Sequence, residues 1–578
     1  MSLGPAAPTC DVAIIGGGPG GSTLGTLLRK YDPSKRVVVL EKERFPRDHV
    51  GESQLPVIGE VLNEMGCWDK VEAANFPVKI GATFRWGKNP ELWDFDFFPA
   101  RQYRDDARPG KYAGQRLSTA FQVDRSKYDT ILLRHAESLG CDVREETQVT
   151  RIHRQGDRIE GLELKNGEVV TARHYVDASG HIGVLRRAMG VESEVPTRLQ
   201  NIAIWDYWQN ADWAVHIGVG ATRIQVMSLS DGWIWFIPLG PTRTSIGFVC
   251  PQEYYKRSGK SPDDLYRDAL SRESRITSLL TNATCENKLS TTKDWSFISQ
   301  RTCGENWWLV GESAGFADPI LSAGLTLTHT GARELAYIIN AIDRAEHDPA
   351  WLKAHYDLTQ RTRVRQHIRF ADYWYAANGQ LVDLRAHCQQ IAGDAGFQLS
   401  PESAWRWLAQ GGFTHDLLDT AAVGTFDVQS IKQLTQMFGD RPAKWNITEF
   451  NVLRLNLDGA KEELIPSFSE GRIVPVKAFS RGPARFPVVG LYKAVGAILQ
   501  RHSNIVDIYD KLVALANEQL PPTEASAAVG QAMQMLEGLL EQGFITATVD
   551  ETQPRLHARL QTSEHIHPNE DLAPGIEK

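Results

Sequence analysis

Short apolar runs separated by glycine-rich turns and a helical segment open the chain. Val12–Ile15 and Val37–Leu40 have the length of buried strands, and Leu24, Leu27 and Leu28 recur between them at helical spacing. This order predicts a strand, a helix and a second strand at the start of an α/β domain.

Alternating and helical patterns continue to about residue 380. Phe76–Trp86 and Leu92–Phe98 alternate as strands do, and residues 201–250 have the pattern of successive strands. From Gly331 to Ala376 the apolar spacing is helical. We therefore expect an α/β core over residues 8–380, in which nucleotide-binding and β-sheet substrate regions interleave.

The character of the sequence changes past residue 400. Val488–Leu515 and Ala525–Gly543 have helical patterns, and Phe544–Val549 has that of a strand. We expect a separate, mainly helical C-terminal domain over residues 400–550, a size usual for a domain. Residues 551–578 are polar and contain proline, and they are predicted to form a flexible tail.

The first strand leads directly into a glycine-rich turn, GGGPGG. Glycines at such a turn let backbone N–H groups approach a pyrophosphate, and the following helix N-terminus adds partial positive charge. Glu41 ends the second strand, where a carboxylate can accept hydrogen bonds from a ribose diol. We assign dinucleotide binding to Gly16, Gly18, Gly20, Gly21, Glu41 and Lys42.

Composition narrows the class of protein. The chain has 578 residues, enough for two or three domains, and a net charge of −8 without a basic block, which argues against a nucleic-acid partner. Its seven cysteines are scattered without a CxxC pair, so neither a metal site nor a disulfide framework is predicted. The N-terminus lacks a signal pattern and no apolar run spans a membrane, so we expect a cytoplasmic protein.

Four sequence blocks together resemble a known family. GGGPGG with VGESAGFADP resembles flavin monooxygenases of the p-hydroxybenzoate hydroxylase type, which implies a Rossmann-like FAD-binding fold. Trp233–Pro238 (WIWFIP) and Phe316–Gly324 (FADPILSAG) match the WxWxIP and FxxPxxSxG patterns of flavin-dependent halogenases, and Lys79 stands at their lysine position. The likeness covers roughly residues 10–380 and is strongest to the halogenases of chloramphenicol and chondrochloren biosynthesis.

The resemblance implies an enzyme that uses reduced FAD, oxygen and chloride or bromide to make hypohalous acid. Lys79 would capture the hypohalous acid, and Trp233 and Trp235, on one face of a strand, would keep substrate from the flavin. Ser322 would be a further catalytic residue, and backbone N–H groups of Ala323 and Gly324 would bind the halide. A product of secondary metabolism, such as an antibiotic precursor, would be halogenated at an electron-rich or activated carbon.

The same resemblance implies a set of flavin contacts. Asp294 aligns with an aspartate that esterifies the flavin in the chloramphenicol-type enzyme, so a covalent link is one expectation. The other flavin-contacting positions are Arg47, Glu52, Ser53, Gln122, Arg125, Val149, Gly311, Glu312 and Asp318.

Only one dinucleotide fingerprint is visible, so a separate flavin reductase is expected to supply reduced FAD. Leu321 stands where tryptophan halogenases carry a glutamate, which argues against tryptophan as the substrate. A flavin hydroxylase or dehydrogenase on the same scaffold, and a non-catalytic flavoprotein that docks a partner, stay open as alternatives. So do a free or carrier-bound substrate, and chloride or bromide.

Overall fold

The structure, a computed structural model, divides into two units. It describes residues 8–381 apart from 105, 198, 218 and 219, residues 433, 437 and 438, residues 445–557 apart from 483, and residues 565–569. Unit 1 comprises Met1–Phe397 and Glu564–Lys578, and unit 2 comprises Gln398–Ser563. Unit 2 is therefore an insertion between two parts of unit 1 rather than a domain that follows it.

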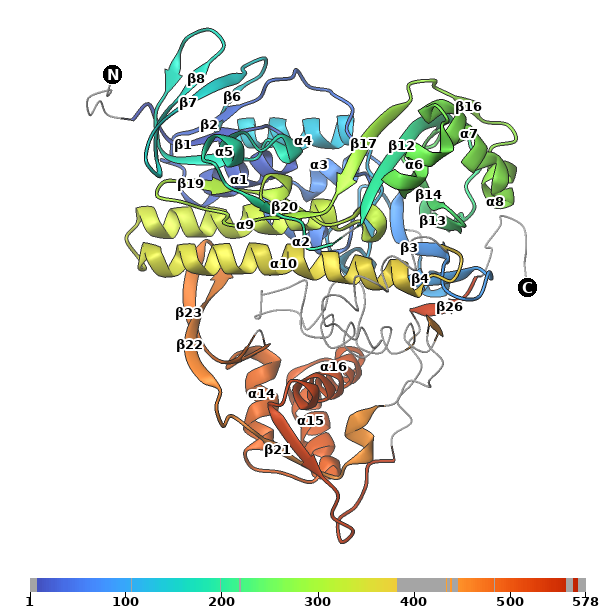
Figure 1. Cartoon of the computed structure of the whole chain (residues 1–578). Coiled ribbons are helices and arrows are strands. Elements are labelled where there is room, and N and C mark those ends of the chain that lie inside the picture. The colour runs from blue at the N-terminus through green and yellow to red at the C-terminus, as the bar shows by residue number, and fades with distance from the viewer. Residues whose placement is uncertain are drawn as a thin grey trace. The chain divides into compact units, whose positions relative to one another are not determined.

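A five-stranded parallel sheet carries the nucleotide-binding turn (Figure 1). Its central strands are buried and almost wholly apolar, as expected where helices cover both faces of a parallel sheet. The predicted strand, helix and strand are present, with α1 at Pro19–Tyr31 between β1 and β2. The strand order is β19 (Trp307–Leu309), β10 (Ala172–Asp177), β1 (Cys10–Ile15), β2 (Val37–Leu40) and β6 (Asp142–Arg144).

A ten-stranded mixed sheet forms the second layer of unit 1. The strands predicted over residues 76–86 and 92–98 are its strands β3 and β4, which pair antiparallel. The strand order is β16 (Thr284–Cys285), β12 (Gln200–Gln209), β15 (Arg243–Pro251), β14 (Gly232–Pro238), β13 (Ala221–Leu229), β3 (Val78–Arg85), β4 (Trp93–Asp96) and β26 (Ile566–Pro568), with β17 (Ser290–Trp295) paired to β12 and β5 (Ala120–Phe121) to β3.

Smaller sheets and helices complete unit 1. The three-stranded sheets are β7 (Val149–Gln155), β8 (Arg158–Leu164) and β9 (Val169–Val170), and β11 (Ser193–Glu194), β18 (Phe297–Ser299) and β20 (Gly315–Phe316). The helices besides α1 are α2 (Val57–Met65), α3 (Trp68–Ala73), α4 (Arg125–Ser138), α5 (Val184–Ala188), α6 (Gln252–Ser258), α7 (Pro262–Arg272), α8 (Ser274–Leu279), α9 (Ala323–Asp343) and α10 (Pro349–Ala377).

The helical pattern predicted over residues 331–376 is two helices, α9 and α10, which lie side by side (Figure 1). The break follows from local chemistry, because Asp348 accepts the Ala350 N–H at 3.0 Å and Pro349 occupies the first helical position. Helix α9 also begins at Ala323, eight residues earlier than the pattern indicated, which places the predicted halide-binding residues at a helix N-terminus.

Unit 2 contains strands as well as helices. Both predicted helical segments are present, but the first of them is two helices, interrupted over residues 500–504. The segment SPESAWRWLAQGG, at residues 400–412, lies outside the described residues. The described elements are β21 (Val452–Leu455), β22 (Lys461–Ser469), β23 (Arg472–Arg481), β24 (Ala484–Pro487), α14 (Gly490–Leu499), α15 (Ile505–Gln519), α16 (Pro522–Glu541) and β25 (Ile545–Thr548).

The prediction of a flexible tail over residues 551–578 is wrong at residues 566–568. Ile566–Pro568 is strand β26, which pairs antiparallel with β4 at the edge of the ten-stranded sheet. Its His567 Nε2 lies 3.1 Å from Asp96 Oδ2, and Arg223 donates to the same buried carboxylate. The tail therefore supplies hydrogen-bond donors to an otherwise costly pair of buried carboxylates, Asp94 and Asp96.

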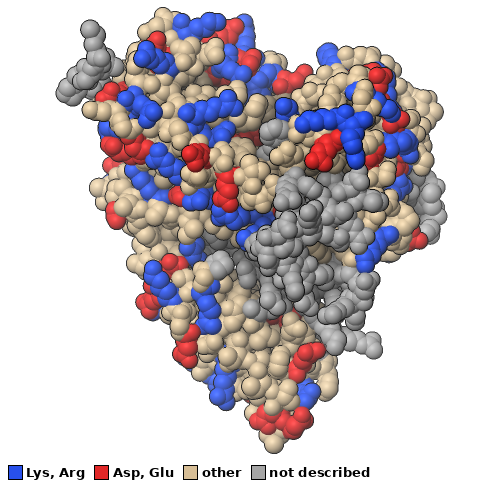
Figure 2. Space-filling view, viewed as in Figure 1, with Lys and Arg blue, Asp and Glu red and all other residues tan. Residues whose placement is uncertain are grey.

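The surface carries charges of both signs. Figure 2 shows Lys and Arg side chains interspersed with Asp and Glu over the face in view. This mixture is what the composition of 63 basic and 71 acidic residues without a basic block predicts.

Candidate active site

The turn after β1 has the backbone that a pyrophosphate site requires. Gly16 has a φ of +105°, and a Cβ there would lie 2.4 Å from the Ala178 carbonyl oxygen. A Cβ on Gly21 would lie 2.0 Å from the Gly16 carbonyl oxygen, so strand and helix can meet this closely only through glycine. Gly18 is the N-cap of α1, and Gly20 lies in its first turn, with their N–H groups at the helix N-terminus.

Glu41 stabilises this turn directly. Its Oε2 accepts the Gly17 N–H at 2.7 Å and its Oε1 accepts the Glu43 N–H at 2.8 Å, which leaves further lone pairs for a ribose diol. Lys42, in contrast, is exposed, and its Nζ lies 3.3 Å from Glu43 on the surface. The lysine side chain is therefore directed to solvent and not to the turn.

Several residues predicted to contact the flavin carry buried polar atoms that no described protein group satisfies. These atoms are Glu52 Oε1, Ser53 Oγ and both amide atoms of Gln122, whereas Arg47 Nη1 lies 3.4 Å from Asp129 Oδ2 without a hydrogen bond. Buried polar atoms are seldom left without hydrogen-bond partners, so this cluster fits a polar cofactor that completes them. The donors and acceptors suit the ribityl and pyrophosphate parts of FAD.

Two other predicted flavin contacts have structural roles. Arg125 donates to Asp129 at 2.7 and 2.9 Å and to the Val50 carbonyl at 2.8 Å, so it holds the loop that leads to Glu52. Val149 packs against the core cluster beside the parallel sheet, which leaves its backbone rather than its side chain for a ligand.

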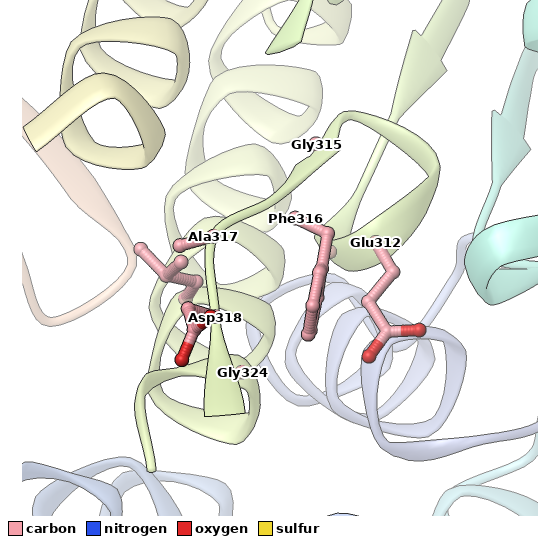
Figure 3. A pocket seen from close by; sticks show the side chains of 8 residues that line it. Glu312, Gly315, Phe316, Ala317, Asp318 and Gly324 are labelled. Carbon is pink, nitrogen blue, oxygen red and sulfur yellow. The ribbon is translucent and has the colours of Figure 1, made fainter. Parts of the chain in front are cut away.

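A pocket lies at the N-terminus of α9 (Figure 3). Glu312 and Phe316 lie side by side in this view, with Asp318 on the other side of the ring. Ser322, at the N-cap, has a φ of +55° and makes no side-chain capping bond, so the first N–H groups of α9 at Ala323 and Gly324 are not capped by it. The lining residues are Gly311, Glu312, Gly315, Phe316, Ala317, Asp318, Gly324 and Leu327.

Burial shifts the two carboxyl groups of the pocket, those of Asp318 and Glu312, toward their protonated, neutral form. Burial raises the pKa of Asp318 to about 7, against hydrogen bonds from the Ile320 N–H, Tyr375 and Asn201. Burial likewise raises the pKa of Glu312, opposed by the nearby charge of Arg125. An anion at the α9 N-terminus is compatible with these side chains when they carry protons, since ionised carboxylates would repel it.

Lys79, on β3, is buried with 2% of its surface exposed. Its Nζ donates to the Gln54 carbonyl at 3.0 Å and lies 5.1 Å from the centre of the Phe97 ring. Burial lowers the pKa of the amine to about 7, so a large share is neutral near physiological pH. The contact with Gln54 also places Lys79 beside the loop that carries Glu52 and Ser53.

A register shift in the sheet determines where Lys79 points. Along β13, Thr222 pairs with Lys79 but Arg223 pairs with Gly81, so Ile80 is an extra residue on β3. The alternation of β13 puts Thr222 on the face of Val226 and Ser228, whose partners on β14 are Trp235 and Trp233. The bulge therefore turns Lys79 toward the face of the two tryptophans.

Trp233 and Trp235 are buried side by side, with ring centroids 6.0 Å apart. Gly247, opposite Trp235 on β15, leaves the space for its ring, because a Cβ at Gly247 would lie 2.1 Å from Trp235 Cζ2. The amine and the indoles thus share one face of the sheet, bounded by the loops at Glu52 and Asp318.

We expect Gly247→Ala to displace the Trp235 ring and to lower the fraction of oxidised FAD that yields halogenated product severalfold, with FAD affinity unchanged. A steric clash of this size costs about 1–3 kcal/mol in a packed core. Product yield per FAD oxidised is the measurement, and Gly530→Ala, with no atom within 4 Å of the added Cβ, is the control. Unchanged yield would show that the ring position does not matter.

Asp294 lies on β17 and pairs with Asn201, whose side chain donates to Asp318 at 3.3 Å. The placement of the Asp294 side chain lies outside what the structure describes. Its backbone position is therefore one strand away from a residue that contacts the pocket lining.

Sequence reasoning missed three residues that connect the site. Tyr375 on α10 and Ser245 on β15 accept the indole N–H groups of Trp233 and Trp235, and Gln54 accepts from Lys79. Tyr375 and Ser245 lie in ordinary helix and strand patterns, so no local signal marks them. Gln54 directly follows the VGES block, and that adjacency was the one signal that could have found it.

Comparison with known proteins decides the family. The family model for tryptophan halogenases matches residues 11–112 and 100–381, which is more than half of the chain. The chain belongs to the tryptophan halogenase family. The prediction of a flavin-dependent halogenase is thus confirmed, and with it an oxidoreductase that uses FAD and halide.

Characterised relatives of the halogenase differ in what they act on. The chain is 31% identical over 388 residues to the 1H-pyrrole-2-carbonyl-[peptidyl-carrier protein] chlorinase of Pseudomonas fluorescens. The match covers 64% of this chain and 84% of the relative. The chain is 33% identical over 347 residues to tryptophan 2-halogenase of Chondromyces crocatus, covering 59% of this chain and 62% of the relative.

Solved structures extend the likeness beyond the matched region. CmlS, a flavin-dependent halogenase, aligns with a TM-score of 0.71 over 97% of this chain and 100% of its own, at 23% identity. The myxobacterial chondrochloren halogenase CndH aligns with a TM-score of 0.58 over 74% of this chain and 96% of its own, at 28% identity. The likeness to CmlS shows a shared fold over more of the chain than the family model matches.

No helix within the described residues of the halogenase is both long and apolar enough to cross a membrane.

Proposed function

We propose that the halogenase delivers oxidised halogen to an electron-rich or activated carbon through the amine of Lys79. The observation that carries this proposal is a buried lysine turned, by a bulge, toward the same sheet face as Trp233 and Trp235. Burial of an ionisable group is costly, and an amine held this way is characteristic of a functional site.

Bound reduced FAD, with oxygen, supplies the oxidising power that converts halide to hypohalous acid. The N–H groups of Ala323 and Gly324 would hold the halide beside the pocket. Lys79 would then hold hypohalous acid at Nζ, either as ammonium donor or as neutral amine, because its pKa is about 7. Trp233 and Trp235 would exclude substrate and bulk water from the flavin side.

The substrate class follows from the relatives and from Leu321. The chlorinase of Pseudomonas fluorescens acts on a pyrrole carried by a protein, as its name states. Leu321 stands at the position where tryptophan halogenases carry glutamate, so we infer a substrate other than tryptophan. An electron-rich ring that is bound to a carrier protein or free fits both observations.

A separate reductase would supply reduced FAD, since one dinucleotide turn is visible and FAD would occupy it. A covalent bond from Asp294 to the flavin is a further part of the proposal, supported by its strand position opposite Asn201. Denaturing the purified protein tests this, because a covalent flavin stays with the chain and Asp294→Asn would release it.

The central experiment supplies reduced FAD, oxygen and either chloride or bromide to the purified chain. Trapped hypohalous acid, and halogenated product from free or carrier-bound pyrroles and phenols, are expected. Hydroxylated product without any trapped hypohalous acid would instead identify a hydroxylase on the same scaffold.

The halide requirement should depend on pH. Asp318 has a pKa of about 7, so it ionises as pH rises and then repels halide. We expect the halide KM to rise roughly tenfold between about pH 7 and pH 8.5. Asp318→Asn should reduce this rise, the rest coming from Glu312, whose pKa burial also raises. Asp372→Asn should keep most of it, because Asp372 interacts with Asp318 but does not line the pocket. A flat wild-type profile would contradict the prediction.

A further inference from the structure

The indole N–H groups of Trp233 and Trp235 are both deeply buried, with 2% and 6% of each residue exposed. An indole N–H can only donate, and a buried donor without an acceptor is costly. Where these two groups donate therefore constrains how the rings lie.

The Trp233 indole is linked to the pocket. Its Nε1 donates to Tyr375 Oη at 2.9 Å, and the Tyr375 hydroxyl donates to Asp318 Oδ1 at 3.0 Å. Tyr375 comes from α10, whereas Asp318 lines the pocket at the N-terminus of α9. The ring of Trp86 also packs against both aromatic partners, with centroids 6.4 Å from Trp233 and 5.8 Å from Tyr375.

The Trp235 indole donates to a hydroxyl beside the other loop of the site. Its Nε1 donates to Ser245 Oγ at 3.1 Å, and the Ser245 hydroxyl is near enough to the Glu52 carboxyl to oppose the rise that burial causes in the pKa of that carboxyl. Glu52 is buried and follows Gly51 in the VGES loop, next to Ser53 and Gln54. Each indole N–H thus donates to a hydroxyl that lies beside a buried carboxyl.

We propose that Tyr375 and Ser245 are positioning residues that fix the two indole rings, each by accepting an indole N–H beside a carboxyl of a different flavin-site loop. The proposal rests on the function proposed above, in which these rings separate flavin from substrate. With both hydrogen bonds in place, each ring has one orientation that satisfies its N–H. The two rings therefore keep substrate from the flavin while the flavin is oxidised. Loss of either hydroxyl leaves the volume of the indole ring unchanged but removes the hydrogen bond that fixes its orientation.

A tryptophan and a tyrosine outside the site, Trp208 and Tyr266, make the same kind of hydrogen bond as Trp233 and Tyr375. Trp208 Nε1 donates to Tyr266 Oη at 2.9 Å, and the Tyr266 hydroxyl donates to the Ile246 backbone carbonyl at 3.0 Å. The geometry is that of Trp233 with Tyr375, but it ends on a backbone carbonyl instead of a carboxyl. Tyr266→Phe therefore removes an equivalent hydrogen bond without touching Trp233 or Trp235.

The test compares Tyr375→Phe, Ser245→Ala and Tyr266→Phe in the full chain. Under turnover with reduced FAD and bromide, the ratio of halogenated product to hydrogen peroxide is expected to fall about 3- to 10-fold in the first two. The rate of FAD oxidation should stay within about twofold of wild type, and Tyr266→Phe should change neither quantity. Ser245→Thr, which keeps the hydroxyl, should restore the ratio lost in Ser245→Ala.

A second readout does not require turnover. In protein labelled with 15N at the indole nitrogens, hydrogen exchange of the Trp233 N–H should accelerate at least about tenfold in Tyr375→Phe, and that of Trp235 in Ser245→Ala. In each variant the Trp208 signal should exchange at the wild-type rate, which shows that the fold is intact.

The outcomes separate the two proposals. Unchanged product ratio and unchanged indole exchange in Tyr375→Phe and Ser245→Ala would overturn the positioning role, as would an equal loss in Tyr266→Phe. If wild type produced no hypohalous acid with any halide, the proposed function would fail. Indole exchange would still decide whether the two hydroxyls hold the rings.

Discussion

Replacing Lys79 by methionine is expected to lower halogenation by about 10²- to 10⁴-fold, the range typical for loss of a group that transfers or holds a proton. FAD affinity and the rate of FAD oxidation should stay unchanged, since Lys79 contacts the Gln54 backbone carbonyl and the Phe97 ring, and neither group is a predicted flavin contact. Halogenated product and trapped hypohalous acid are measured separately.

The same substitution should make unit 1 more stable. The pKa of Lys79 is about 7 in the folded chain against an ordinary value of 10.5 in the unfolded chain, so the unfolded chain binds the extra proton between these values. The free energy of unfolding of wild type should therefore rise with pH across this window. Methionine removes that slope and, near pH 7, a cost on the order of a few kcal/mol.

Lys127→Met is the matched control for both effects. Lys127 also donates to a backbone carbonyl, that of Ala74 at 2.7 Å, and lies 5.4 Å from the Phe76 ring centre, but it is exposed. It should leave activity and the pH dependence of unfolding unchanged. Halogenation by Lys79→Met at the wild-type rate would remove the amine from the mechanism.

Gly16→Ala is expected to lower FAD affinity at least about 100-fold. The residue has a φ of +105°, and the added Cβ would lie 2.4 Å from the Ala178 carbonyl oxygen, so both strain and clash oppose the native turn. Strain of about 1–3 kcal/mol with the added clash corresponds to two or more factors of ten. Fluorescence titration of the apoprotein with FAD gives the affinity.

Gly167→Ala is the control that introduces backbone strain outside the nucleotide-binding turn. Gly167 has a φ of +86°, but nothing lies within 4 Å of an added Cβ. This variant should lose about 1 kcal/mol of stability and bind FAD as wild type does. If Gly16→Ala bound FAD equally well, the turn would not be the pyrophosphate site.

The sequence patterns predicted the parallel sheet and its glycine turn because both depend on local spacing. The apolar residues of β1 and the glycines after them lie next to each other in the chain, and their chemistry needs no distant partner. Glu41 was identified for the same reason, as the residue that ends the second strand. Lys42 was assigned only because it follows Glu41 in the sequence, and its side chain is on the surface.

The rest of the site depends on register and on distant contacts. Strict alternation along β3 would put Lys79 on the face of Gly81 and Thr83, and only the extra residue Ile80 turns it around. Such a bulge leaves no mark in the apolar pattern. Tyr375 meets Trp233 across 142 residues of chain, so the contact could not be read from spacing.

The return of the chain at Ile566–Pro568 has a consequence for how the protein is made and handled. Strand β4 obtains this neighbour from a segment far along the chain, since His567 and Asp96 are 471 residues apart, so the sheet that carries Lys79 lacks a strand until that segment has been made. A nascent chain, a premature stop or a protease cut just before β26 would each expose that edge.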